Sequence, residues 1–167
     1  MKTSFKLITA SDRGDYDDFK TLLQIYAKTD LDDPRNSAIW KDLAELPGRY
    51  APPTGGVVLA RLGTELAGCG ALSATAKSGL AEIKRVYVLS AFRRQGLARE
   101  LTLAAMELAR QSGYRAVGIM TWAHNQQAIA LYRQLGFEPV PKFRDSSKAH
   151  HIFLGLSLTP DNHNAPS

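Results

Sequence analysis

The chain contains one cysteine, Cys69, in 167 residues, and it has no long uninterrupted apolar run. A lone cysteine excludes an internal disulfide framework and a cysteine-rich metal site. The four histidines show no metal-ligand spacing, so we predict no metal. No segment approaches the roughly 20 apolar residues of a membrane span, and residues 1–10 lack the apolar core of a secretory signal. We therefore expect a cytoplasmic protein with no membrane partner.

The net charge of +5 is modest, and the arginines gather around residues 85–115 rather than along a terminal arm. Such a cluster favours a polyanionic cofactor, and the sequence has no aromatic and basic platform or recognition-helix motif. We predict no nucleic-acid partner. The length suits one domain, which we expect over residues 1–158. A polar, proline-containing tail at 159–167 is predicted to be disordered.

Residues 81–112 predict a strand, a short basic turn and a long helix. The run Ile83 to Leu89 is rich in β-branched and aromatic residues, as expected of a buried strand. The pattern then changes to helical spacing, and Gly113 ends the helix. The apolar face of this helix consists of Leu97, Leu101, Ala104, Ala105 and Leu108.

The turn before this helix is Arg93-Arg94-Gln95-Gly96-Leu97-Ala98. A tight glycine turn leaves unpaired backbone N–H groups at a helix N-terminus, where the helix dipole and nearby arginines favour a phosphate or pyrophosphate. An ordinary basic turn that caps a surface helix is the alternative.

Two motifs in order resemble those of the GNAT-type N-acetyltransferase superfamily. The turn fits R-x-x-G-x-A after Val86-Tyr87-Val88, and residues 125–137 fit N-x-x-A-x-x-L-Y-x-x-x-G-F at every listed position. The strand E-x-K-R-x-Y-V, beginning at Glu82, and the loop L-P-G-x-Y-x-P-P-x-G, beginning at Leu46, resemble one branch of that superfamily. A rigid connector is the interpretation that we favour for the loop over a direct substrate contact.

The order of expected elements predicts a mixed α/β sheet with helices on both faces. The resemblance implies the GNAT acyltransferase fold, with about seven strands and about four helices. The expected strands are one around Phe5 and Leu7, then 57–61, 66–72, 83–89, 116–122, 137–143 and 151–158. Pro139 and Pro141 limit the strand at 137–143 to an edge or an interrupted strand. The expected helices are 15–29, 36–46, one from 97 to Gly113, and 125–135 with Gly136 as its cap.

The resemblance implies acetyl-CoA as co-substrate, with its pyrophosphate on the amides of residues 94–99. It also implies that the strand carrying Val86 to Val88 splays from strand 116–122, so that the pantetheine arm pairs with free strand backbone. At least one of Arg93 and Arg94 is expected to contact phosphate. The predicted cofactor-binding residues are Val86, Tyr87, Val88, Arg93, Arg94, Gln95, Gly96, Leu97, Ala98, Arg99, Asn125 and Tyr132.

Three groups are candidates for the chemistry of acetyl transfer. The backbone N–H of Val88 is placed to polarise the thioester carbonyl. Glu82 is the candidate base, directly or through water, with an ion pair to Lys84 or Arg85 as the alternative. Tyr132 occupies the motif's tyrosine and is the candidate acid, although a helical phenol is also a common core residue. Asn125 is expected to cap its helix or touch the cofactor.

Two other side chains have ordinary packing interpretations. Cys69 lies in an apolar strand-like segment and is expected to be buried, with a catalytic thiol as the less favoured interpretation. Trp122 is expected to pack in the core or to wall the acceptor pocket.

The resemblance leads us to expect acetyl transfer to a primary amine of a small molecule or peptide, by direct attack in a ternary complex. The competing function is a CoA-binding sensor without turnover. The acidic residues Asp30, Asp32, Asp33 and Glu45 either attract a cationic acceptor or are simply solvated. Edge strands near the C-terminus make a homodimer a further expectation.

Overall fold

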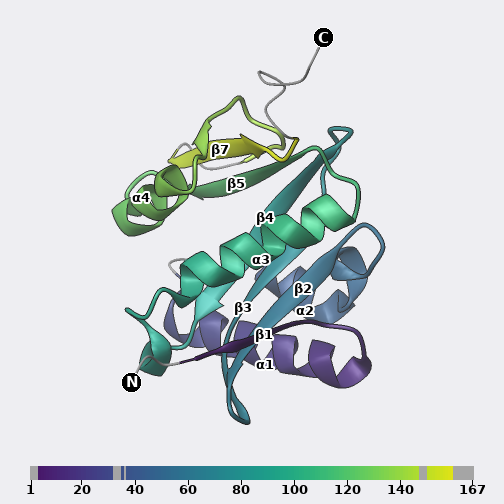
Figure 1. Cartoon of the computed structure of the whole chain (residues 1–167), viewed down its shortest axis with the longest axis vertical. Helices are drawn as coiled ribbons and strands as arrows, with labels where there is room; N and C mark the ends of the chain where they lie inside the picture. The colour runs from purple at the N-terminus through teal and green to yellow at the C-terminus, as the bar shows by residue number, and fades with distance from the viewer. Residues whose placement is uncertain (1–3, 32–34, 36, 147–149, 160–167) are drawn as a thin grey trace.

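The computed structural model describes residues 4–31, 35, 37–146 and 150–159. Seven strands form one sheet in the order β1-β2-β3-β4-β5-β7-β6, which confirms the predicted mixed sheet (Figure 1). All neighbouring strands are antiparallel except β4 and β5. The strands are β1 (Lys6–Thr9), β2 (Gly56–Leu62), β3 (Glu65–Ala74), β4 (Leu80–Val88), β5 (Ala116–Trp122), β6 (Glu138–Pro139) and β7 (His151–Ser157). The helices are α1 (Arg13–Thr29), α2 (Ile39–Glu45), α3 (Leu97–Gln111) and α4 (Gln126–Gln134), with short 3₁₀ helices η2 (Gly48–Tyr50) and η3 (Ser90–Phe92).

Helices cover both faces of the sheet, as predicted (Figure 1). On one face α3 packs across β2, β3 and β4, and its apolar residues share a core with Tyr132 of α4. On the other face α1 packs over the same strands, and α2 packs beside α1. Asp12 is the N-cap of α1, because its carboxylate accepts a hydrogen bond from the N–H of Asp15 and so satisfies a free helix donor.

The parallel pairing of β4 with β5 is short, so the two strands separate and leave a gap in the sheet. The two strands pair only from Leu80 to Glu82, so β4 diverges from β5 beyond Glu82 as the resemblance implies. A bulge bends β4 where this happens. From the pair Ala71–Lys84 to the pair Cys69–Tyr87, β4 advances three residues while β3 advances two. The bulge lies at Arg85, whose backbone adopts a left-handed conformation with a φ of 56°.

Several predicted boundaries were wrong. The strand predicted at 137–143 is shorter than expected, but β6 lies at the edge of the sheet as Pro139 and Pro141 predicted, because neither proline has an N–H to donate. The loop that begins at Leu46 is rich in proline and glycine, which argues against regular structure, but part of it forms η2. The helix predicted over 36–46 spans only α2, and Asn36 lies outside the described residues. Only Thr159 of the predicted tail is described, and the single domain at 1–158 stays a prediction.

Candidate active site

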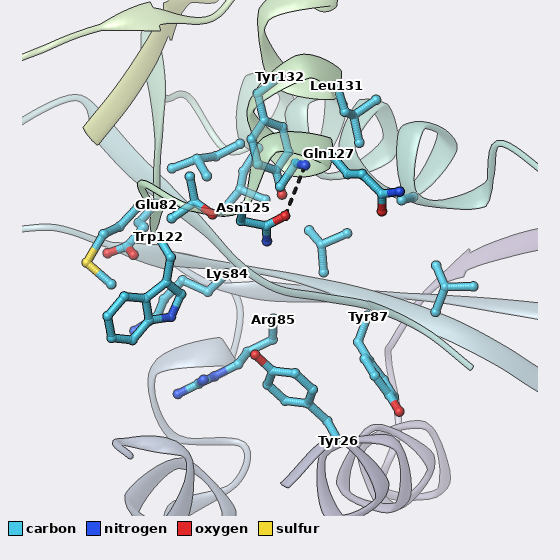
Figure 2. Close-up of a pocket in the computed structure, with 18 of the residues that line it drawn as sticks. Tyr26, Glu82, Lys84, Arg85, Tyr87, Trp122, Asn125, Gln127, Leu131 and Tyr132 are labelled. Atoms are coloured by element: carbon cyan, nitrogen blue, oxygen red, sulfur yellow. Dashed lines mark hydrogen bonds between the residues drawn. The ribbon is translucent and has the colours of Figure 1, made fainter. Parts of the chain in front are cut away.

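A cavity of about 1090 Å³ opens where β4 and β5 separate. Its walls come from β4, β5, the start of α3, and α4. In Figure 2, Gln127, Leu131 and Tyr132 of α4 lie on one side of β4, and Tyr26 and Tyr87 lie on the other. The cavity therefore reaches both faces of the sheet, because its lining comes from α3 and α4 on one face and from α1 on the other.

The predicted phosphate-binding turn lines one end of this cavity. Gly96 is the N-cap of α3 with a φ of 78°, and no side chain of the cap residue satisfies the first helical N–H groups. Arg94 also has a positive φ, 63°, and the residues from Arg93 to Gly96 are exposed. The turn thus presents backbone donors, the positive end of the α3 dipole and arginines to the cavity, which is a suitable arrangement for an anion.

Arg93 is held by protein groups. Its Nε donates to the carbonyl of Val88 at 2.9 Å, and its Nη2 donates to Asp30 at 3.1 Å. The hydroxyl of Tyr87 donates to the same carboxylate at 2.6 Å, and this hydrogen bond is the main cause that lowers the pKa of Asp30. Arg93 and Asp30 therefore fasten the turn to the end of α1. Asp32 and Asp33 lie outside the described residues.

The residues of β4 divide between the two faces. Val86 and Val88 pack in the core under α3, whereas Tyr87 packs in the core under α1. Because the N–H of Leu89 donates to Ala67 of β3 at 2.9 Å, strand alternation turns the N–H of Val88 toward the open side that faces β5. The side chain of Tyr87 lies between Val86 and Val88 in sequence and therefore points to the opposite face of β4.

Tyr132 and Asn125 lie together at the α4 side of the cavity (Figure 2). Tyr132 is 8% exposed, and burial, with a smaller contribution from Tyr26, raises its pKa to about 12. Its phenol therefore keeps its proton at neutral pH. Asn125 is the N-cap of α4 and accepts a hydrogen bond from the N–H of Ala128 at 3.2 Å, which confirms the predicted cap.

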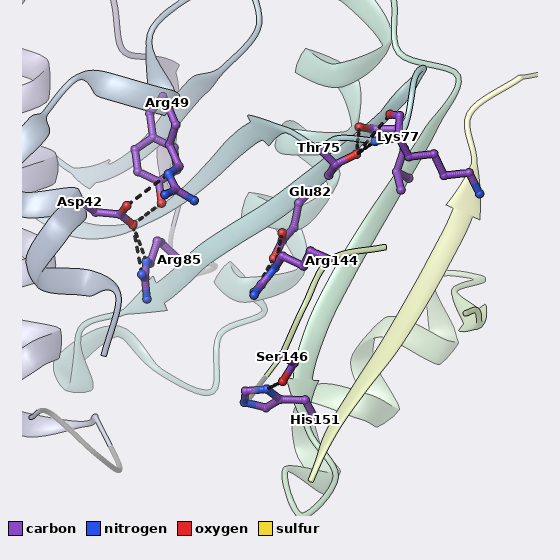
Figure 3. Close-up of polar contacts among 11 residues, drawn as sticks. Asp42, Arg49, Thr75, Lys77, Glu82, Arg85, Arg144, Ser146 and His151 are labelled. Atoms are coloured by element: carbon purple, nitrogen blue, oxygen red, sulfur yellow. Dashed lines mark hydrogen bonds and ion pairs between the residues drawn. The ribbon is translucent and has the colours of Figure 1, made fainter. Parts of the chain in front are cut away.

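Glu82 is buried at the last paired position of β4 and β5. It forms an ion pair with Arg144, whose Nε and Nη2 lie 2.8 and 3.1 Å from its two carboxylate oxygens (Figure 3). The alternative pairing with Lys84 or Arg85 was wrong because Arg144 reaches the carboxylate from the segment before β7. Each carboxylate oxygen has a further lone pair beyond the one that accepts from Arg144, and Glu82 is among the residues that line the cavity.

Sequence reasoning missed a basic cluster, defined here as Arg49, Lys84, Arg85 and Arg144. Arg49 and Arg85 both bind the buried carboxylate of Asp42, at 3.3 and 3.0 Å (Figure 3). The hydroxyl of Tyr50 donates to the same carboxylate at 2.5 Å. Lys84 lines the cavity, and burial together with its basic neighbours lowers its pKa to about 8. These residues are far apart in sequence, and only the Glu82 strand motif, which contains Lys84 and Arg85, gave any signal for them.

The remaining predicted residues have clear positions. Cys69 is fully buried, its thiol donates to the carbonyl of Arg85 at 3.3 Å, and burial raises its pKa to about 12, so the expected packing role is confirmed. Trp122 lines the cavity and stacks edge-on against His151, whose Nδ1 hydrogen-bonds to Ser146. Across the described part of the chain, no group of three or more His, Cys, Asp or Glu side chains could hold a metal ion.

The mixed sheet, split between β4 and β5 beside the N-terminus of α3, has the GNAT acyltransferase fold that solved acyltransferases share with this chain. The chain belongs to the acetyltransferase (GNAT) family, whose sequence profile matches residues 19–137.

The chain is 36% identical over 101 residues to the uncharacterized N-acetyltransferase YjgM of Escherichia coli. The matched segment covers 59% of this chain and 60% of that protein. It is 28% identical over 147 residues to an uncharacterized N-acetyltransferase of Schizosaccharomyces pombe, covering 87% of this chain and 90% of that one. A Salmonella typhimurium acetyltransferase solved with acetyl-CoA has the same fold, with a TM-score of 0.70, 20% identity and 98% coverage of both chains.

Proposed function

We propose that this enzyme transfers an acetyl group from acetyl-CoA to a primary amine of a small molecule or peptide, by direct attack in a ternary complex. The observation that carries this proposal is the cavity that reaches both faces of the sheet through the gap between β4 and β5. It gives two substrates separate approaches to one place, as direct transfer between them requires.

The donor side of the proposal uses the turn and the open edge of β4. The diphosphate of acetyl-CoA binds the amides of residues 94–99, with positive charge from Arg94 and Arg99, because Arg93 is already engaged. The pantetheine arm lies along Val86 to Val88 as an added strand. The N–H of Val88 donates to the thioester oxygen and stabilises the negative charge that develops there.

The chemical step moves one acetyl group and one proton. The neutral amine attacks the carbonyl carbon, the C–N bond forms, and the C–S bond breaks. An ordinary amine has a pKa of about 10.4, so only about one molecule in a few thousand is neutral at pH 7, and a base must take its proton. We assign this role to Glu82, directly or through water, and we assign to Tyr132 the donation of a proton to the departing thiolate.

Calorimetry with acetyl-CoA, followed by thiol release over a panel of amines, tests the function. Gly96→Ala and Gly113→Ala are matched variants, since both residues have positive φ and open space where a Cβ would lie. Both variants incur similar backbone strain of about 1–2 kcal/mol, but only Gly96→Ala should weaken acetyl-CoA binding. Binding without thiol release would favour the sensor, and a failure to bind acetyl-CoA would contradict both functions.

Glu82→Gln should lower turnover by about 100-fold or more and change the pH–rate profile, since the amide cannot accept the amine's proton. The pH dependence of kcat/KM measures this. Glu107→Gln is the control because Glu107 is exposed on α3, where it pairs with Arg110. A Glu82→Gln profile that matches the wild-type profile would rule out Glu82 as the base.

Location and assembly remain predictions. No helix within the described ranges is long and apolar enough to cross a bilayer. Cytoplasmic location is proposed from the sequence, and fractionation of cells tests it. The homodimer through the C-terminal edge strands is likewise a proposal, and sedimentation velocity tests it.

A further inference from the structure

The basic cluster carries more positive charge than its acidic partners neutralise. Asp42 accepts from both Arg49 and Arg85, and both oxygens of Glu82 accept from Arg144. The two carboxylates are therefore committed to arginines (Figure 3). Among the residues that the structure describes, none forms an ion pair or hydrogen bond with the ammonium of Lys84.

Lys84 is nevertheless drawn into the cavity wall. It is half-buried, and it lies on β4 between Glu82 and the bulge at Arg85, on the opposite face from Ile83 and the α3 core (Figure 2). Burial is the largest cause that lowers its pKa, and Arg85, Arg144 and Arg49 lower it further, while Glu82 opposes them. An unpaired, partly desolvated ammonium is costly for the fold, which is expected where a ligand supplies the missing anion.

We propose that the amine acceptor carries a carboxylate, as a free amino acid does, and that this carboxylate binds Lys84 within the basic cluster. The inference rests on the proposed acetyl transfer. Lys84 lies four residues before Val88, so at about 3.3 Å per residue its Cα is within ~13 Å of the thioester's proposed place. A lysine side chain spans part of that interval, which leaves room for a small acceptor. Asp145 also lines the cavity, but it is exposed and is not among the charges acting on Lys84.

Thiol release from acetyl-CoA over matched pairs of L-amino acids and their carboxamides tests the inference. The members of each pair share the amine and side chain and differ only in the charge of the carboxyl group. We expect kcat/KM to be about ten- to a hundredfold higher for the acids, the usual size of a charged hydrogen bond. The kcat/KM of the amides then gives the rate of acetyl transfer to acceptors that lack the carboxylate.

Three lysine variants assign that preference to a side chain. Lys84→Met should remove most of the preference by raising KM for the acids, with little change for the amides. Its melting temperature should equal or exceed that of the wild type, because it removes a partly buried unpaired charge. Lys84→Arg retains the charge and should retain the preference. Lys77→Met, on the exposed connection between β3 and β4, should change neither.

The outcomes separate this inference from the function on which it rests. Equal kcat/KM for acids and amides overturns the inference while leaving acetyl transfer intact. Loss of turnover on acids and amides alike in Lys84→Arg also overturns it, because that pattern marks Lys84 as the base. If no amine releases thiol, the proposed function fails. Melting temperatures with CoA and either an acid or its amide then decide: a Lys84-dependent rise with acids alone supports carboxylate binding, and its absence overturns it.

Discussion

Tyr132→Phe is expected to lower turnover by about 100- to 10,000-fold while leaving the KM for acetyl-CoA nearly unchanged. The substitution removes one hydroxyl from a side chain that is buried beside Phe137 at a ring-centroid distance of 5.8 Å, so the packing of the phenyl ring is retained. In the proposed mechanism, the variant loses only the proton donor for the departing thiolate. Steady-state kinetics with a saturating amine measures the effect.

The pH dependence sharpens this expectation. The pKa of Tyr132 is raised to about 12, so the donor form is present throughout the range below that value. An activity decline between pH 8 and 10 must then come from another group. Tyr114→Phe is the control, because the hydroxyl of Tyr114 donates to the carbonyl of Thr54 at 2.6 Å, away from the cavity lining. A loss of less than severalfold in Tyr132→Phe would remove the assignment.

Asp42→Ala is expected to destabilise the protein by about 3–5 kcal/mol, because it leaves Arg85 largely buried without its partner. The side chain of Asp42 is 2% exposed and accepts from Arg85, Arg49 and Tyr50, so the variant removes the centre of the whole network. At about 2–4 °C per kcal/mol for a chain of this length, the melting temperature should fall by roughly 6–20 °C. Calorimetric unfolding measures the change.

An aspartate on the surface, in contrast to the buried Asp42, provides the control for that experiment. Asp18 pairs with Arg61, and both side chains are partly exposed. Asp18→Ala should therefore cost about 1 kcal/mol or less. Equal losses in the two variants would show that the Asp42 network contributes no more than a surface ion pair.

Where local patterning sets the structure, the sequence predicted it well. Strand 116–122 matches β5 at both ends, and Leu97 begins α3 as the change to helical spacing predicted. Gly96 in the left-handed conformation is also a local requirement, since the turn needs a positive φ. Arg85 has a positive φ without being glycine, and pairing with β3 imposes it, so its own residue type gave no signal.

The polar partners in the site were not predictable in the same way. Glu82 and Arg144 are separated by 62 residues and meet only after α3, β5, α4 and β6 have folded between them. Likewise, the loop that begins at Leu46 resembled a connector, yet it delivers Arg49 and Tyr50 to Asp42 on α2. Contacts of this kind depend on the tertiary fold, whereas periodicity reports only the local conformation.

An interrupted sheet has inner as well as outer margins, and such margins usually invite aggregation. Here the divergence of β5 from β4 creates them inside the molecule, closed at one end by the paired residues Leu80–Glu82 and flanked by α4. In the proposed function, the thin, amide-bearing pantetheine arm pairs with these margins as an added strand. The backbone of β4 beyond Glu82 is thus left without a β5 partner inside the molecule, rather than at an outer edge of the sheet.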